Sequence, residues 1–283
     1  MNLILDTCTI NNLLQVDLLL ENDNCSLEYD YLKRIHNKFK IKIPPKIYEE
    51  LNNTFSKNLN TGSEKKFIQN YMSRYICQYI DNVDKNDFES SLNFIKITQP
   101  KYQDEDNGEL HLTAYALYLN RYQDTIAFQT HFITDDDEAI LDFKDFFKIN
   151  FLGTILTTID LLLLMSIYGI ISLNEVLDFS YNLKKQYSQT YNKLINEIKT
   201  LQKKELPAKE IALLSRLHDN INDFNFDALK KDREHKVYEK IKQKNKNIEI
   251  FIKSFLNEDF KKVTILEQKI TEIKSQYWDL SKV

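Results

Sequence analysis

The sequence predicts an α/β fold with a parallel sheet of four or five strands, followed by an all-α C-terminal extension. Two observations predict this fold class. Through the first 183 residues, short apolar runs alternate with amphipathic stretches, as in strands joined by helices. Beyond residue 183 the chain contains no Gly and one Pro, which indicates long helices. We therefore expect two domains, residues 1–183 and residues 184–283.

Four short apolar runs are the predicted strands, and two of them end in carboxylates. Asn2–Leu5 leads directly into Asp6, and His131–Thr134 leads into a run of three Asp. Ile41–Ile43 is stopped by a pair of prolines, and Phe147–Leu152 is the predicted fourth strand. The carboxyl ends of parallel strands meet at one edge of the sheet, where sites form. We therefore expect the two carboxylate-bearing strand ends to be neighbours.

The predicted helices follow from capping residues and amphipathic spacing. Pro45 suits the first turn of the helix that follows it, and Ser172–Glu175 matches a capping box. Gln103–Glu109 is an acidic loop that opens a helix. In chain order the predicted helices cover residues 10–20, 27–39, 46–53, 62–80, 87–95, 109–121, a segment around Asp160, 172–205, 207–223, and 227–280 with a break near Asn257.

Cysteine usage and the N-terminus predict a cytoplasmic protein without a membrane span. Cys8, Cys25 and Cys77 have no metal-finger spacing, and an odd count is a poor disulfide framework, so we expect buried free thiols. The N-terminus lacks the basic region of a secretory signal. Residues 149–171 are apolar enough for a span, but Asp160 at their centre would cost at least ~2.5 kcal/mol in lipid. A buried strand and a core helix are the better interpretation.

Charge is unevenly distributed along the chain. The net charge is −4, but residues 1–183 hold 16 Lys and Arg against 27 Asp and Glu, a net of −11. Residues 184–283 hold 22 against 15, a net of +7. This asymmetry suggests a metal site in the acidic part and a polyanion contact in the basic part.

Carboxylates recur at four separated positions on predicted strand ends and helices. Mg²⁺ and Mn²⁺ prefer oxygen ligands, and phosphate-cleaving sites use one or two such ions. Each acid alone also has a structural explanation as a helix cap, a solvated side chain or a partner of a helix dipole. Only the set, in this order and on these elements, favours a site. Its members are Asp6, Glu49 or Glu50, Glu109, and Asp135, Asp136 and Asp137.

Five motifs in order give the first 180 residues a resemblance to PIN domains, the fold of many toxin ribonucleases and of some RNA-decay nucleases. They are LILDTCTINNLL (3–14), IPPKIYEEL (43–51), GELHLTAYAL (108–117), FITDDDEAI (132–140), and FLGTILTTIDLL with GIISLNEVL (151–177). The resemblance implies a PIN-like three-layer fold and a carboxylate-bound metal site. The long segment 52–102 and the helical extension depart from the small toxins of the family.

The resemblance assigns the first three acids. Asp6 takes the first position, and Glu50, directly before a Leu, suits the second better than Glu49. Glu109 takes the third, with Glu in place of the more usual Asp. Asp6 and Glu109 are thereby implied metal ligands, and Glu50 joins them in the implied catalytic set.

The fourth acid stays open between two neighbours. Asp135 and Asp136 both match the family's position, so each is an implied catalytic residue and metal ligand. Thr134 matches a frequent polar residue that orients a ligand or water, and Asp137 is a further supporting residue.

Residues 230–246 form a basic segment, with eight basic residues against three acidic ones. A basic helix face is usually only solvated, but beside an acidic nuclease body it is also a candidate for contacts with backbone phosphates. The candidate RNA-binding residues are Lys230, Lys231, Arg233, Lys236, Lys240 and Lys242, with Lys244 and Lys246 beyond them.

The expected function is a Mg²⁺- or Mn²⁺-dependent endoribonuclease, in the role of a toxin or an anti-phage defence effector. The expected partners are RNA and an antitoxin or defence-system protein, with a homo-oligomer also open. The alternative from another class is a non-catalytic PIN-like RNA-binding or scaffold protein. A complete set of acids argues against it, because degenerate members lose these carboxylates. A DNA-directed nuclease of the same fold is the third possibility.

Overall fold

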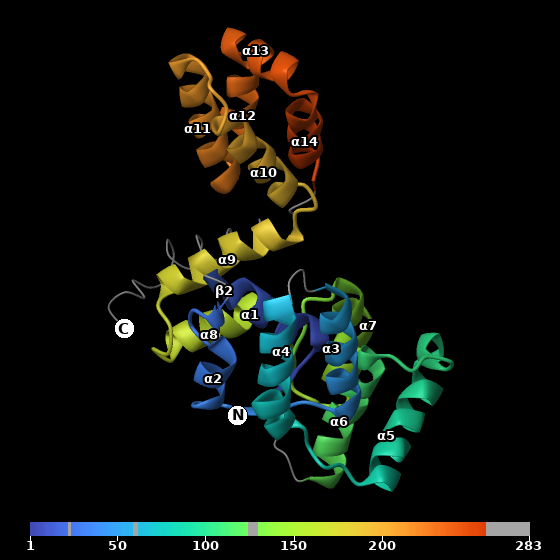
Figure 1. Ribbon diagram of the computed structural model, residues 1–283. Coiled ribbons are helices and arrows are strands. Elements are labelled where there is room, and N and C mark those ends of the chain that lie inside the picture. Colours follow the sequence, from blue (N-terminus) through green and yellow to red (C-terminus); the bar gives the residue numbers. More distant parts are fainter. Residues whose placement is uncertain (22–23, 59–61, 124–129, 259–283) are drawn as a thin grey trace. The chain divides into compact units, whose positions relative to one another are not determined.

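The computed structural model describes residues 1–21, 24–58, 62–123 and 130–258. It divides into two compact units between Val176 and Leu177, within helix α9 (Leu173–Tyr187) (Figure 1). The sequence placed this division after residue 183, further along the same helix.

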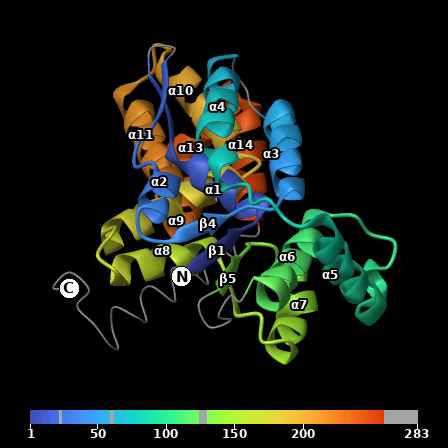
Figure 2. The ribbon, with the colours of Figure 1, turned by 90° about the horizontal axis from the view of Figure 1, so that it is seen from below.

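Among the described residues of the first unit, four parallel strands form one sheet in the order β4-β1-β5-β6. Figure 2 shows β4, β1 and β5 side by side. The register pairs Leu5 with Ile133 at the carboxyl ends of β1 and β5, so the predicted parallel sheet and the predicted neighbourhood of these two ends are confirmed. The strands are β1 (Asn2–Leu5), β4 (Lys40–Lys42), β5 (Thr130–Ile133) and β6 (Thr154–Leu156).

The central strands form because consecutive apolar residues are buried on both faces of the sheet. Leu3, Ile4 and Leu5 in β1 and Phe132 and Ile133 in β5 have no exposed side-chain surface. Such continuous apolar runs are typical of parallel strands covered by helices on both sides. The two strand ends that carry the acids are therefore fixed in a rigid part of the molecule.

Only some helices of the first unit reach the edge where the strands end. Those that reach the strand-end edge are α1 (Thr7–Asp17), α3 (Pro45–Asn58), α6 (Gly108–Tyr122) and α7 (Asp137–Ile149). The remaining helices are α2 (Tyr31–His36), α4 (Gly62–Arg74), α5 (Lys85–Thr98) and α8 (Thr158–Ile167), with the 3₁₀ turns η1 (Ile76–Tyr79) and η2 (Pro100–Tyr102).

Several sequence predictions in this unit are wrong. The helix predicted for residues 62–80 ends at Arg74 and is followed by the 3₁₀ turn η1. The predicted strand Phe147–Leu152 is the end of α7 and a turn, and the strand of this region is β6. Phe143, Phe146 and Phe147 are buried at helical spacing, so the apolar run belongs to a helix face. The helices predicted over residues 10–20 and 27–39 are also too long at their facing ends. An antiparallel pair of strands, β2 (Leu18–Glu21) and β3 (Asn24–Leu27), takes up these residues.

The second unit is helical and has its own apolar core. Buried Leu, Ile, Phe and Tyr side chains from residues 194–255 pack together in it. The predicted single helices 172–205 and 227–280 are broken into shorter ones, and residues 259–280 of the latter lie outside the described residues. Besides the continuation of α9, the helices are α10 (Tyr191–Gln202), α11 (Ala208–Asn222), α12 (Phe226–Arg233), α13 (Lys236–Lys244) and α14 (Lys246–Leu256).

Local capping groups stabilise the breaks between these helices. The Glu258 carboxylate accepts bonds from Ser188 and Thr190 and fixes the chain between α9 and α10. The side chains of His235 and Asn245 cap α13 and α14. The predicted break near Asn257 is confirmed, because Asn257 is the C-cap of α14.

The apolar segment 149–171 contains β6 and α8, as the interpretation of a buried strand and core helix predicts. Helix α8 has ten residues, and Asp160 forms a capping box with Thr157 at its start. In the described part of the chain, no helix has both the length and the apolar character needed to cross a membrane. The three cysteines are free thiols, but Cys8 and Cys25 are half-buried and Cys77 is exposed, so their predicted burial is wrong.

Candidate acidic active site

A pocket of about 360 Å³ lies at the carboxyl-end edge of the sheet. Four predicted acids line it, from four different places in the sequence: Asp6, Glu50, Glu109 and Asp136. No Lys, Arg or His is among its lining residues in the described structure. The other lining residues are Thr7, Cys8, Asn11, Thr54, Asn107 and Gly108.

Asp6 is the most enclosed acid of this acidic pocket, with 6% of its surface exposed. It caps α1, where its Oδ1 accepts a bond from the Thr7 backbone N–H at 2.7 Å. Its Oδ2 accepts from the Thr134 hydroxyl at 2.7 Å and from the Cys8 thiol at 3.0 Å. Burial raises the pKa of Asp6 despite these donors, and the nearby Glu50 charge raises it further.

Glu50 lies in α3 and faces the start of α6. Its Oε2 accepts a bond from the Thr7 hydroxyl at 2.9 Å. A side chain at position 108 would collide with it, because an added Cβ on Gly108 would lie 2.4 Å from Glu50 Oε2. The missing side chain at Gly108 thus makes room for the carboxylate. Glu49 is exposed and lies outside the pocket, so the preference for Glu50 agrees with the geometry.

Glu109 lies in the first turn of α6, after the N-cap Asn107. Its Oε2 accepts a bond from the Tyr102 hydroxyl at 3.1 Å, and the same hydroxyl lies 2.7 Å from Asp142 Oδ2 in α7. Burial raises the pKa of Glu109, and the charges of Asp136 and Asp6 raise it further. The tyrosine therefore holds Glu109 in place while the other acids of the pocket oppose its ionisation.

The neighbouring acids Asp135 and Asp136 have different surroundings. The Asp135 carboxylate accepts bonds from Asn12 Nδ2 at 2.7 Å, from the Thr158 N–H at 2.8 Å and from the Thr158 hydroxyl at 2.5 Å. It joins α1 to α8 and is not among the pocket's lining residues. Asp136 caps α7 and lines the pocket. Of the two residues left open by the sequence, Asp136 is therefore placed with the other acids.

Thr134 and Cys8 connect the two central strand ends beneath the acids. The buried Thr134 hydroxyl donates to Asp6 and accepts from the Asp136 backbone N–H at 3.1 Å. The Cys8 sulfur accepts from the Asp135 N–H at 3.2 Å. Thr134 was expected as a supporting residue, whereas Cys8 was expected only as a buried thiol. Its position two residues after Asp6 was the one signal in the sequence.

Two further sets of predicted residues are Asp137 and the basic segment of the second unit. Asp137 is exposed at the start of α7 and does not line the acidic pocket. In the second unit, Lys230, Lys231, Lys236 and Lys240 are exposed, and Lys242 is half-buried beside Glu239 at 3.5 Å.

Two basic residues of the segment have internal partners. Arg233 contacts the buried Glu249 at 2.8 Å, and Lys244 contacts the buried Glu210 at 2.7 Å. Both side chains therefore hold helices of this unit together, and Arg233 is a weaker RNA-binding candidate than the sequence suggested.

The donor set of the acidic pocket fits a hard divalent cation. Its carboxylates and neutral oxygen groups are the ligands that Mg²⁺ and Mn²⁺ prefer, and the Cys8 thiol, which also lines the pocket, is bonded to Asp6. The carboxylates line the pocket without converging, since no three His, Cys, Asp or Glu side chains in the described residues form a ready ligand group. Mg²⁺ commonly keeps several waters and takes one or two protein carboxylates. The residues thus suit a largely hydrated ion better than a closed cage.

Comparison of the chain with protein-family models, with curated proteins and with solved structures gave no match. The resemblance to PIN domains accordingly stands on the motifs of the sequence.

Proposed function

We propose that this chain is a Mg²⁺- or Mn²⁺-dependent endoribonuclease with a PIN-like nuclease domain. One observation carries the proposal: four carboxylates line one pocket at the strand-end edge, and no basic side chain of the described structure lines it with them. Like charges that share a pocket oppose one another's ionisation, and burial adds to that cost. A divalent cation in the pocket would remove both penalties. A purely structural cluster of acids would be expected to include Lys or Arg partners.

The chain's own residues would orient the substrate and hold the acids. Thr134 and Cys8 fix Asp6, Thr7 fixes Glu50, and Tyr102 fixes Glu109. When bound, the cation would supply charge neutralisation at the phosphate and a lower pKa for an attacking water.

The helix ends at the pocket favour the same kind of substrate. Helices α1, α6 and α7 all begin there, and their N-termini carry partial positive charge, which favours a phosphate oxygen. No nucleophilic side chain is required, because water is the attacking group.

The proposal predicts that Asp6→Asn and Glu109→Gln each lower Mn²⁺-dependent RNA cleavage by about a hundredfold or more, the scale of losing a group that stabilises developing charge. The measurement is cleavage of a labelled single-stranded RNA by the full chain, with EDTA as the metal-free control. Activity should also fall as pH drops, because the raised pKa values of Asp6 and Glu109 let protons compete with the cation.

Unchanged cleavage in both variants would exclude this pocket as the active site. Binding of RNA without cleavage at any Mn²⁺ concentration would favour the non-catalytic alternative. Cleavage of single-stranded DNA in preference to RNA would favour the DNA-directed one.

A further inference from the structure

A second pocket, of about 420 Å³, is built on the same two helices as the acidic pocket. Helix α3 contributes Pro45 to it and Glu50 to the acidic pocket, and α6 contributes His111 and Glu109. At 1.5 Å of helix rise per residue, these pairs are separated by about 7.5 Å and about 3 Å along the helix axes. The two pockets therefore lie near one another along α3 and α6, although residues two and five positions apart leave a helix in different directions.

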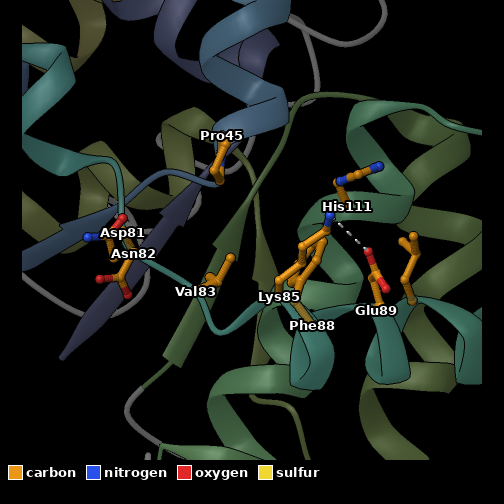
Figure 3. A pocket seen from close by; sticks show the side chains of 9 residues that line it. Pro45, Asp81, Asn82, Val83, Lys85, Phe88, Glu89 and His111 are labelled. Carbon is orange, nitrogen blue, oxygen red and sulfur yellow. Dashed lines mark ion pairs between the residues drawn. The ribbon is translucent and has the colours of Figure 1, made fainter.

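Two aromatic rings form a wall at one end of this second pocket (Figure 3). The half-buried rings of Phe88 and His111 have centroids 5.7 Å apart. His111 Nε2 lies 2.7 Å from Asp106 Oδ1, which fixes the imidazole, and the Tyr118 ring supports Phe88 edge-on at 6.4 Å. Single-stranded nucleic acids are commonly bound by stacking their bases on such rings.

The other end of the pocket carries a carboxylate and an amide, Asp81 and Asn82, with Val83 between them and the aromatic end (Figure 3). The Asp81 Oδ2 atom accepts bonds from the Lys42 ammonium group and the Tyr115 hydroxyl, which hold the carboxylate in place. An ionised carboxylate only accepts hydrogen bonds, whereas an amide both donates and accepts them.

The charges of the second pocket do not favour a phosphate. Lys42 is paired with Asp81, and Lys85 is paired with Glu89 at 4.0 Å, four residues further along α5. The remaining lining side chains Pro45, Val83, Phe88 and Leu92 are apolar. The pocket thus suits a flat ring with polar edges.

We propose that the second pocket binds a guanine base of the RNA strand whose phosphate lies in the acidic pocket. This inference rests on the proposed ribonuclease function. The Watson–Crick edge of guanine presents two adjacent N–H donors and one carbonyl acceptor. Asp81 accepts from the donors, Asn82 donates to the carbonyl, and the base stacks on Phe88 and His111. Adenine, cytosine and uracil each place a ring acceptor or a second carbonyl against the carboxylate and fit it less well.

Nucleoside binding to the full chain tests this site without any need for cleavage. Guanosine, adenosine, cytidine and uridine are titrated separately by calorimetry. Guanosine should bind most tightly, and Phe88→Ala should weaken its binding by about tenfold, the scale of losing one base-stacking ring. Phe88→Leu keeps apolar bulk for folding and should show a similar loss. Equal binding of all four nucleosides overturns the proposal.

The matched control is Phe94→Ala, in the same helix α5. Phe94 packs on Phe146 and Arg121 instead of lining the pocket, so its loss should leave guanosine binding unchanged. Asp81→Asn should shift the preference from guanosine toward adenosine, because the amide matches a donor beside an acceptor. Equal effects of Phe88→Ala and Phe94→Ala would also overturn the proposal.

Cleavage assays separate the two proposals. Metal-dependent RNA cleavage without preferential guanosine binding would overturn the base site and leave the ribonuclease proposal standing. Preferential guanosine binding that Phe88→Ala weakens, without any cleavage, would support the base site and overturn the ribonuclease proposal.

Discussion

Two adjacent carboxylates at the end of β5 illustrate how backbone geometry separates roles at the scale of single residues. Asp135 accepts three hydrogen bonds from α1 and α8, so its oxygens are committed to holding those helices. Asp136 caps α7 with Oδ1, which accepts from Glu138 N at 2.8 Å, and it also lines the acidic pocket. The first residue is suited to stability and the second to the site.

This difference gives a prediction for two variants. Asp136→Asn should lower Mn²⁺-dependent cleavage strongly and leave the melting temperature nearly unchanged, because Asn is also a good N-cap. Asp135→Asn replaces one of the two carboxylate oxygens with an amide N–H₂ group, which would face one or two of the three donors, and should cost roughly 1–3 kcal/mol of stability. Thermal unfolding and cleavage rates of the two variants check this. A reversed pattern, with Asp135→Asn inactive but stable, would reassign the fourth acid.

The sequence could predict which acids are candidates for the site, but not which of the two neighbours at the end of β5 belongs to it. Asp6, Glu50 and Glu109 each follow a recognisable strand or helix start, and the structure places all three in one pocket. The choice between Asp135 and Asp136 depends on the directions in which two successive side chains leave a strand end. The apolar periodicity of the sequence does not predict these directions beyond the strand itself. A helix-capping pattern was present, since Asp136 precedes Glu138 and Ala139, whose N–H groups donate to it.

At the scale of elements, α6 lies very close to α3 at its first residue. Gly108 is the first residue of α6, and an added Cβ there would lie 2.4 Å from Glu50 Oε2 and 2.9 Å from Ile47 Cδ1, both in α3. The carboxylate is the flexible end of its side chain, so it would move before the helices did. The glycine therefore matters for the position of Glu50 more than for the fold.

Gly108→Ala should lower cleavage by about tenfold or more while changing the melting temperature little. The expected stability effect is small because Ala favours helix and offsets the local crowding. Gly62→Ala is the matched control, because Gly62 is also the first residue of a helix and has nothing within 4 Å of an added Cβ. Equal activities of the two variants would show that the approach of α6 to α3 does not set the site.

The elements were predictable where an apolar run or a cap marked their limits. The central strands and α1, α3 and α6 follow from buried apolar runs and caps. The β2–β3 pair was missed because Leu18–Glu21 directly continues the apolar pattern of α1 without a turn residue between them. Strand β6 was misplaced because the aromatic run before it satisfies a buried helix face as well as a strand.

At the scale of the whole molecule, the charge asymmetry remains the main reason to expect RNA binding by the second unit. Residues 184–283 carry a net charge of +7, and Lys230, Lys231, Lys236 and Lys240 are exposed. Arg233 and Lys244 instead neutralise buried carboxylates within the unit. Backbone phosphates would therefore be bound by the exposed lysines.

Replacing Lys230, Lys231, Lys236 and Lys240 with Gln should weaken RNA binding and reduce its dependence on salt. The log–log slope of affinity against salt concentration should fall by about 0.7 for each phosphate that is no longer neutralised. The turnover of bound RNA should change little. Affinity at two salt concentrations measures the slope, and Gln at the exposed Lys203, Lys204 and Lys209 in the same unit is the control. A slope unchanged in the first variant would mean that these lysines only solvate their helices.

Binding of Mn²⁺ to the full chain tests the proposed metal site most directly. We predict saturable Mn²⁺ binding by calorimetry in the wild-type chain and in Glu49→Gln, whose side chain is exposed and outside the pocket. Glu50→Gln, one residue along the same helix, should bind Mn²⁺ much more weakly because it removes one of four carboxylates that line the pocket. Equal Mn²⁺ affinity in the two variants, or no saturable binding in the wild type, would contradict the assignment of a metal to this pocket.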